Sequence, residues 1–191
     1  RALASSADLR ARLDVPFLTG MTSSPYLVGP HGYYLRDPES LKPLLWDTRR
    51  QAAMVFDASD TEPLLEGRVP VADAVEVGAD DERWVHHGVT AATAFTHLVE
   101  HFGQYGPEWA TGICEIPAAT IRRIANEYLG HARVGETIEI DGQTLPFRPV
   151  AVTLGKTVNN GWGAYECCWS RTMLAVLVGA LEVPGGTLGT T

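Results

Sequence analysis

The residues best suited to bind a ligand lie in one short segment, Gly155–Gly163, which contains three glycines and two asparagines. An apolar, β-branched run, Pro149–Leu154, precedes this segment, and a helical pattern follows it. Glycines let a ligand approach the backbone closely, and the N–H groups and dipole at a helix N-terminus attract a phosphate. The segment therefore predicts a phosphate or nucleotide site where a strand, a glycine-rich loop and a helix meet.

The known phosphate-binding motifs do not occur in this segment. It contains neither G-x-G-x-x-G nor G-x-x-x-x-G-K-[ST], so a tight strand-to-helix connection that binds nothing remains an alternative. The following helix has an apolar second half, Met173–Leu181, which we expect to be buried on every side. A second glycine turn, Pro184–Gly189, comes after it.

The cysteines and a pair of histidines are weaker candidates for a functional site than the glycine-rich segment. The three cysteines, Cys114, Cys167 and Cys168, lack C-x-x-C spacing, which excludes zinc-ribbon and cluster-ligand motifs, and the adjacent pair is predicted to pack. A pair of histidines, His86 and His87, could relay protons, but a polar loop is the favoured interpretation. The sequence thus predicts no metal site and no catalytic residue.

Composition limits the class of protein. The 191 residues are 45% hydrophobic and 20% charged, as in an ordinary globular protein, and the net charge of −8 argues against binding nucleic acid. Nine of the acidic residues fall in 57–82 with Arg68 as the only basic one, which predicts an acidic surface loop. The apolar helix core is too short to cross a bilayer.

The order of the predicted elements indicates an α/β fold. Residues 1–104 form an irregular α/β segment, and 105–191 form a second segment that carries the glycine-rich loop. The first segment contains a predicted hairpin over 33–46, a strand over 51–57 and a helix over 90–102, whose apolar residues have helical spacing. In the second, helices begin at Pro107 and Pro117, Arg122 and Arg123 lie on a solvated face, and Asp141-Gly142 sets the turn of a hairpin insertion over 136–147.

Several of these segments together resemble a known family. The runs Tyr105–Ala110 (YGPEWA) and Ile116–Ala125 (IPAATIRRIA), followed by Gly155–Asn160 (GKTVNN) and Gly179–Gly186 (GALEVPGG), resemble ordered motifs of the molybdopterin oxidoreductases, the dimethyl sulfoxide reductase superfamily. Residues 14–37 are similar to a further segment of that family. The resemblance implies that the chain is an internal piece of a multi-domain catalytic subunit with Rossmann-like strand–loop–helix elements.

The resemblance also implies a cofactor and the residues that hold it. Members of the family carry molybdenum or tungsten on two molybdopterin guanine dinucleotides. By position, one dinucleotide would lie against the glycine-rich loop and the turn that follows the helix: Gly155, Lys156, Val158, Asn159, Asn160, Gly161, Gly163, Pro184, Gly185 and Gly186. Asn160 stands where the family usually has Gln, and Gly161-Trp162-Gly163 departs from the usual neighbourhood, so the cofactor atoms touched are not assigned.

The remaining implications concern the whole protein. The family's metal ligand and the cysteine motif of its 4Fe-4S cluster lie N-terminal to these motifs, so this segment binds neither. The reaction class is two-electron oxygen-atom transfer or hydroxylation of a small-molecule substrate. The partners would be a membrane anchor subunit together with an iron–sulfur electron-transfer subunit, and the family tendency is a periplasmic or membrane-associated location.

Two stretches of the chain indicate a branch of the family, and two other classes of protein stay open. The hairpin 136–147 and the run Gly161–Glu166 most resemble the branch of arsenate, polysulfide and tetrathionate reductases and of phenylacetyl-CoA:acceptor oxidoreductase, with the last preferred. Two alternatives stay open. One is a non-catalytic α/β module that binds an ordinary nucleotide through Gly155–Gly163, and the other is a structural protein that keeps the fold without a cofactor.

Overall fold

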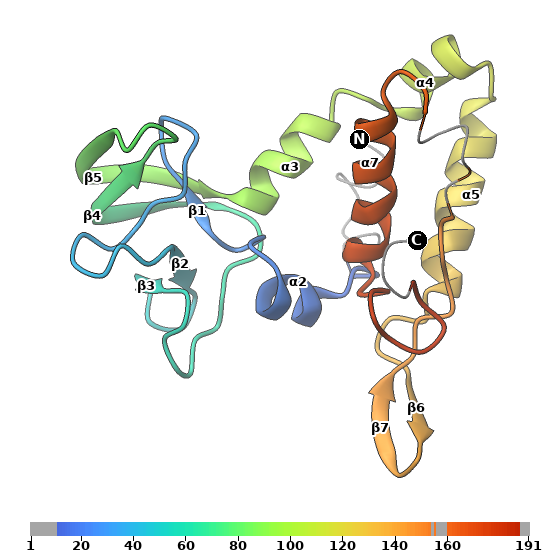
Figure 1. The fold of residues 1–191 in the computed structure, drawn as a ribbon, viewed down its shortest axis with the longest axis horizontal. Coiled ribbons are helices and arrows are strands. Elements are labelled where there is room, and N and C mark those ends of the chain that lie inside the picture. Colours follow the sequence, from blue (N-terminus) through green and yellow to red (C-terminus); the bar gives the residue numbers. More distant parts are fainter. Residues whose placement is uncertain (1–10, 154, 156–159, 188–191) are drawn as a thin grey trace. The chain divides into compact units, whose positions relative to one another are not determined.

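The computed structural model describes residues 11–153, 155 and 160–187, and the chain divides into two compact units. The sheet unit is Leu18–Gln104, and the helical unit combines the segment before Leu18 with the chain from Tyr105 onward (Figure 1). The first predicted segment, 1–104, therefore contributes to both units. Among the described residues, no helix combines the length and apolar character needed to cross a membrane.

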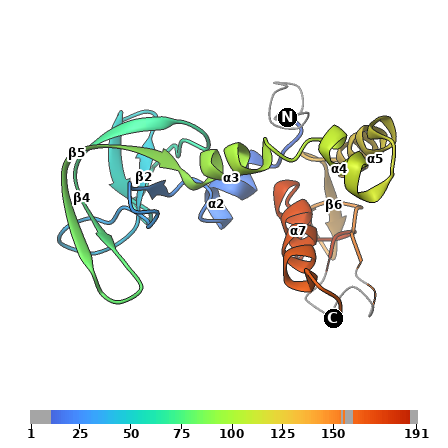
Figure 2. The same cartoon turned by 90° about the horizontal axis from the view of Figure 1, so that it is seen from above.

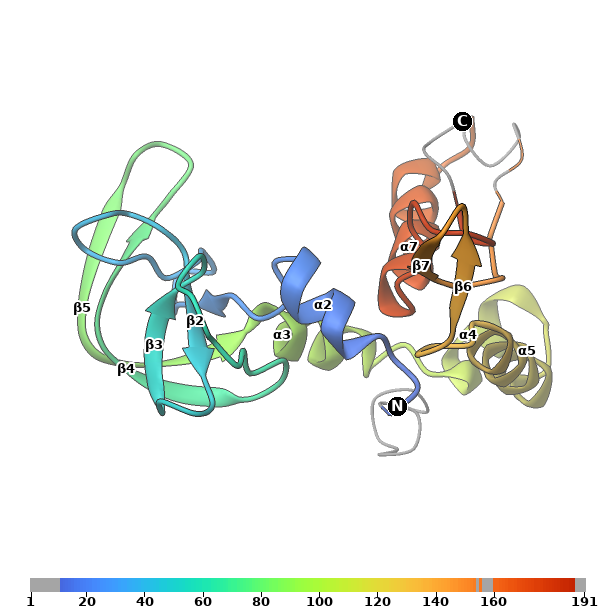
Figure 3. The same ribbon diagram turned by 90° about the horizontal axis from the view of Figure 1, so that it is seen from below.

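Antiparallel strands build the sheet unit. Its three-stranded sheet has the order β1 (Leu27–Val28), β5 (Arg83–Thr93), β4 (Arg68–Val77), and the long β4–β5 pair dominates Figure 2. A second sheet pairs β2 (Leu44–Asp47) with β3 (Ala52–Val55) (Figure 3). Both sheets contribute side chains to one hydrophobic core: Leu27, Leu35, Leu44, Trp46, Val69, Val71, Ala74 and Ala91.

Two helices flank the strands of the sheet unit along the sequence. α2 (Val15–Met21) precedes β1 and crosses the boundary between the units. α3 (Ala94–Phe102) follows β5 directly, and the hydroxyl of its N-cap Thr93 accepts a hydrogen bond from the Thr96 N–H. The predicted helix over 90–102 is therefore correct from Ala94, while Thr90–Thr93 end a strand.

The helical unit contains two long helices. They are α5 (Ala118–His131) and α7 (Ala164–Leu177), whose Leu129 and Ala175 belong to one hydrophobic core (Figure 1), and the Tyr128 hydroxyl donates to the Leu174 carbonyl. α4 (Pro107–Cys114) begins at the predicted proline. The predicted hairpin insertion is confirmed as β6 (Thr137–Ile140) paired with β7 (Gln143–Pro146).

The α/β class is confirmed, but the strand predicted at Pro149–Leu154 is wrong for its described residues. Each named strand pair is antiparallel, and 149–153 are not in a strand. Pro149 lacks an N–H, the Val150 N–H bonds to the carbonyl of Arg148, and the Val152 carbonyl accepts from the Arg171 side chain. These local partners satisfy backbone groups that a strand would pair.

Three other expectations require correction. The acidic segment 57–82 contains β4, whose Val69, Val71 and Ala74 belong to the hydrophobic core while Asp73 is exposed. The hairpin over 33–46 is only a short ladder with a bridge between Arg36 and Pro43, since β2 pairs mainly with β3. Met173–Leu181 is not a helix buried all round: α7 ends at Leu177, and Ala175 is its one buried residue among those described.

Candidate functional site

The predicted dinucleotide loop is described only at its two ends. Lys156, Val158 and Asn159 lie outside the described residues, and the neighbouring Gly155, Asn160 and Gly161 are exposed. Gly163 is the N-cap of α7 with φ of 71°, a left-handed conformation that favours glycine. No side chain of a described residue caps this helix, although the Ala164 N–H at its start bonds to the Gly161 carbonyl.

One feature of this helix end opposes an anion. Glu166 lies in the first turn of α7, where its negative charge would repel a phosphate at short range.

The second predicted element, Pro184–Gly186, forms a tight turn whose glycines are explained by the chain itself. A Cβ on Gly185 would lie 2.8 Å from the Pro149 Cα, and a Cβ on Gly186 would lie 2.6 Å from the Ala180 carbonyl oxygen. These distances are too short for any side chain. Close backbone packing therefore requires glycine at both positions, with or without a ligand.

The structure brings together a different set of residues in the sheet unit. Glu76, on β4, is completely buried, and its carboxylate accepts hydrogen bonds from the backbone N–H groups of His31 and Tyr33, each at 3.1 Å. The ring Nε2 of His86, on β5, lies 2.7 Å from Glu76 Oε2. The carboxylate therefore has protein partners on both oxygens, as a buried anion requires.

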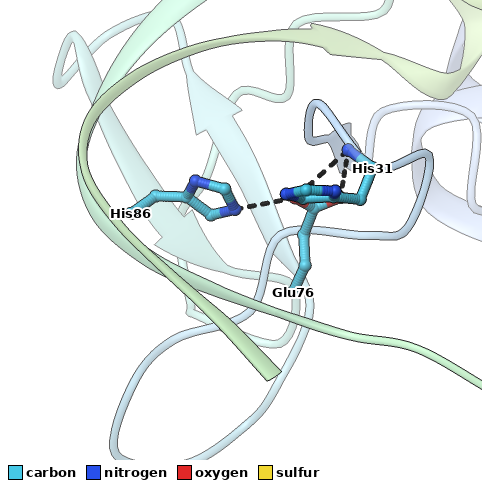
Figure 4. A group of neighbouring side chains, drawn as sticks. All are labelled: His31, Glu76 and His86. Atoms are coloured by element: carbon cyan, nitrogen blue, oxygen red, sulfur yellow. Dashed lines mark hydrogen bonds and ion pairs between the residues drawn. The ribbon is translucent and has the colours of Figure 1, made fainter. Parts of the chain in front are cut away.

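Two imidazoles and this carboxylate form one compact cluster (Figure 4). In Figure 4 the His86 ring points at the carboxylate, and dashed lines join the carboxylate to His86 and to the backbone of His31. One potential ligand atom from each of His31, Glu76 and His86 lies within 4.8 Å of the others. His31 is exposed, and its ring stacks on Trp84 with 4.3 Å between ring centroids.

Strand register explains why these side chains meet. Ala74 lies opposite His86, and Glu76 lies opposite Trp84, so all four residues share one face of the β4–β5 pair. His87 points to the other face, where its exposed ring pairs with Asp73 at 2.7 Å. The two adjacent histidines thus have opposite environments.

A turn that contains Gly29 and Gly32 positions His31 beside Glu76. The Gly29 N–H bonds to the Tyr33 carbonyl, and the Gly32 N–H bonds to the Gly29 carbonyl. A Cβ on Gly29 would lie 2.4 Å from the carboxyl carbon of Glu76, so only glycine lets the turn close over this carboxylate. Gly32 has φ of 86°, which also favours glycine.

The sequence patterns do not predict this cluster, for identifiable reasons. They indicate an acidic surface loop around Glu76 and a polar loop around His86, and they do not single out His31. The signal that could have located the cluster is the alternation V-P-V-A-D-A-V-E-V over 69–77, which puts Glu76 on the same face as apolar Ala74.

The cysteines do not contribute a site within the described part of the chain. Cys114 is exposed at the end of α4, Cys167 is exposed and Cys168 is partly buried on α7. The prediction that Cys167 and Cys168 both pack is therefore wrong for Cys167. Arg122 and Arg123 form surface ion pairs with Glu108 and Glu127.

Comparison with known proteins gives one informative similarity. No protein-family model matches the chain. The chain is 25% identical over 197 residues to a sulfite dehydrogenase subunit of Allochromatium vinosum, in a match that covers 91% of this chain. The same match covers 19% of that protein, so the chain spans about a fifth of its length. The chain is thus similar to one part of a redox-enzyme subunit.

Proposed function

We propose that this chain is a segment of the catalytic subunit of a molybdenum- or tungsten-dependent oxidoreductase. The observation that carries the proposal is the similarity, along 91% of the chain, to a protein named for oxidation of sulfite. The ordered motifs at Tyr105–Ala110, Ile116–Ala125 and Gly155–Asn160 favour the same class. Overall similarity and local motifs therefore both support a redox enzyme.

The cofactor we propose is a pair of molybdopterin guanine dinucleotides that carry the metal. Gly155, Asn160, Gly161 and Gly163 would hold one dinucleotide with the residues between them, because these described positions are open and the N-terminus of α7 is uncapped by any described side chain. Pro184–Gly186 would add a wall. When bound, the cofactor supplies two-electron redox chemistry at the metal.

We propose a small sulfur oxyanion as the substrate, with sulfite as the first compound to test. The relative's name favours this over the coenzyme A thioester that the hairpin 136–147 suggested. The balanced reaction takes sulfite and water to sulfate, two protons and two electrons. An iron–sulfur partner subunit would accept the electrons, and a membrane anchor subunit would complete the assembly at the periplasmic side.

The glycine-rich loop offers a direct test. Asn160→Asp in the full-length protein places a negative charge where we expect a phosphate, and repulsion of about 1 kcal/mol should lower bound pterin and sulfite-dependent acceptor reduction about fivefold. Asn126→Asp is the matched control, because Asn126 is exposed on α5 and its side-chain oxygen already accepts from Arg12.

Each outcome has a defined meaning. Equal pterin content in both variants would contradict the assignment of this loop. Tight binding of ATP or NAD by a pterin-free protein would instead establish the nucleotide-binding module.

A further inference from the structure

We propose that His31, Glu76 and His86 bind a single divalent transition-metal ion of the zinc type, with water as the fourth ligand. This inference does not depend on the molybdenum proposal, since the cluster lies entirely within the sheet unit. Two imidazole nitrogens and one carboxylate oxygen are a donor set that suits zinc, whereas magnesium and calcium prefer oxygen ligands alone.

The groups around the cluster hold the ligands as a metal site requires. Oxygen Oε1 of Glu76 accepts the Tyr33 N–H at 3.1 Å and the His31 N–H at 3.1 Å, which directs Oε2 toward the imidazole of His86. Such outer hydrogen bonds fix the orientation of ligating carboxylates. Trp84 fixes the plane of the His31 ring by stacking, with an angle of 15° between the two rings.

A purely structural role explains only part of this arrangement. The backbone N–H groups of His31 and Tyr33, both bonded to Glu76, are enough to fasten the turn 29–33 to β4. The His31 ring is not needed for that fastening, and neither of its nitrogens has a hydrogen bond among the described residues. The ring nevertheless lies with a nitrogen within 4.8 Å of both other ligand atoms.

Binding requires only small movements. Ligand atoms around a tetrahedral zinc ion are about 3.3 Å apart, given bond lengths of about 2.0–2.1 Å. The 2.7 Å contact between His86 and Glu76 must widen, and the exposed His31 ring must move inward from its present place. The ion would lie between His86 and Glu76, so their hydrogen bond must break when zinc binds.

The test is a zinc titration of the full-length protein after dialysis against a chelator, in competition with a chromophoric chelator. His31→Ala should weaken binding of one zinc ion at least about tenfold, because it removes a ligand while leaving the fastening of Glu76 intact. His87→Ala is the matched control, since His87 is one residue from His86 but faces the opposite side of the strand pair.

Cobalt provides a second readout. Co²⁺ at this site should give the intense visible absorption of a four-coordinate complex, and the absorption should disappear in His31→Ala but persist in His87→Ala. If wild type and His31→Ala bind the same number of zinc ions with the same affinity, the proposal is overturned and the cluster is a structural fastening alone. An equal loss in His87→Ala would overturn it as well.

Discussion

At the scale of single residues, this chain places carboxylates where backbone N–H groups can satisfy them. Asp47 is completely buried at the end of β2, and its Oδ1 accepts the N–H groups of Arg49 and Arg50 at 2.8 and 2.9 Å. These backbone hydrogen bonds, that from Arg50 first, hold the pKa of Asp47 below its ordinary value, and the Arg50 side chain assists. The folded state therefore favours the ionised form.

A pH dependence of stability follows from this lowered pKa. The contribution of Asp47 is present above the ordinary pKa of an aspartate, about 3.9, and is lost as pH falls through the lower folded value. Asp47→Asn should reduce the free energy of unfolding at pH 7, and the difference from wild type should shrink below about pH 4. Urea unfolding across this range measures it. Asp80→Asn, at an exposed aspartate, is the control, and a difference for Asp47→Asn that does not vary with pH would contradict the argument.

At the scale of elements, one buried arginine joins the parts of the helical unit. The Arg148 guanidinium donates to Asp14 at 2.8 Å and to the carbonyls of Val178, Arg133 and Glu136. These partners come from the segment before α2, the end of α7, and the link between α5 and β6. Arg148 thus fixes the positions of elements that are distant in sequence.

Removing this arginine should cost much more than removing a surface one. Arg148→Met leaves Asp14 buried without its cation, so the free energy of unfolding should fall by about 3–5 kcal/mol. Arg123→Met removes only the exposed pair with Glu127 and should cost less than about 0.5 kcal/mol. Denaturant unfolding compares the two, and a cost for Arg148→Met no greater than the control would refute this role. Adding Asp14→Asn to Arg148→Met should recover part of the loss.

Elements with strong local signals were predictable from sequence, and those that depend on distant partners were not. Asp141 and Gly142 have φ of 51° and 76°, as a type I′ turn requires, so the hairpin follows from its turn residues. β4 was not predicted because the charged residues Asp73 and Glu76 are unusual in a strand. In the structure His87 pairs with Asp73, while His86 and the backbone of the turn 29–33 pair with Glu76. The same absence of long-range information hid the histidine–glutamate cluster.

At the scale of the whole molecule, each unit has its own hydrophobic core. Leu27, Val71 and Ala91 belong to the core of the sheet unit, whereas Leu129 and Val178 belong to that of the helical unit. Separate cores predict separate cooperative transitions.

Variants can assign those transitions. Calorimetry should show Arg148→Met lowering the transition of the helical unit, and Gly29→Ala lowering that of the sheet unit because its Cβ would displace the Glu76 carboxylate. A single transition shifted equally by both variants would disprove independent unfolding.

The measurement that tests the central proposal most directly is the metal and pterin content of the native full-length protein. Elemental analysis combined with fluorescence of the oxidised pterin should find about one molybdenum or tungsten and two pterins per chain. Folded protein that contains neither, from a host able to synthesise the cofactor, would contradict the assignment to this class of oxidoreductase.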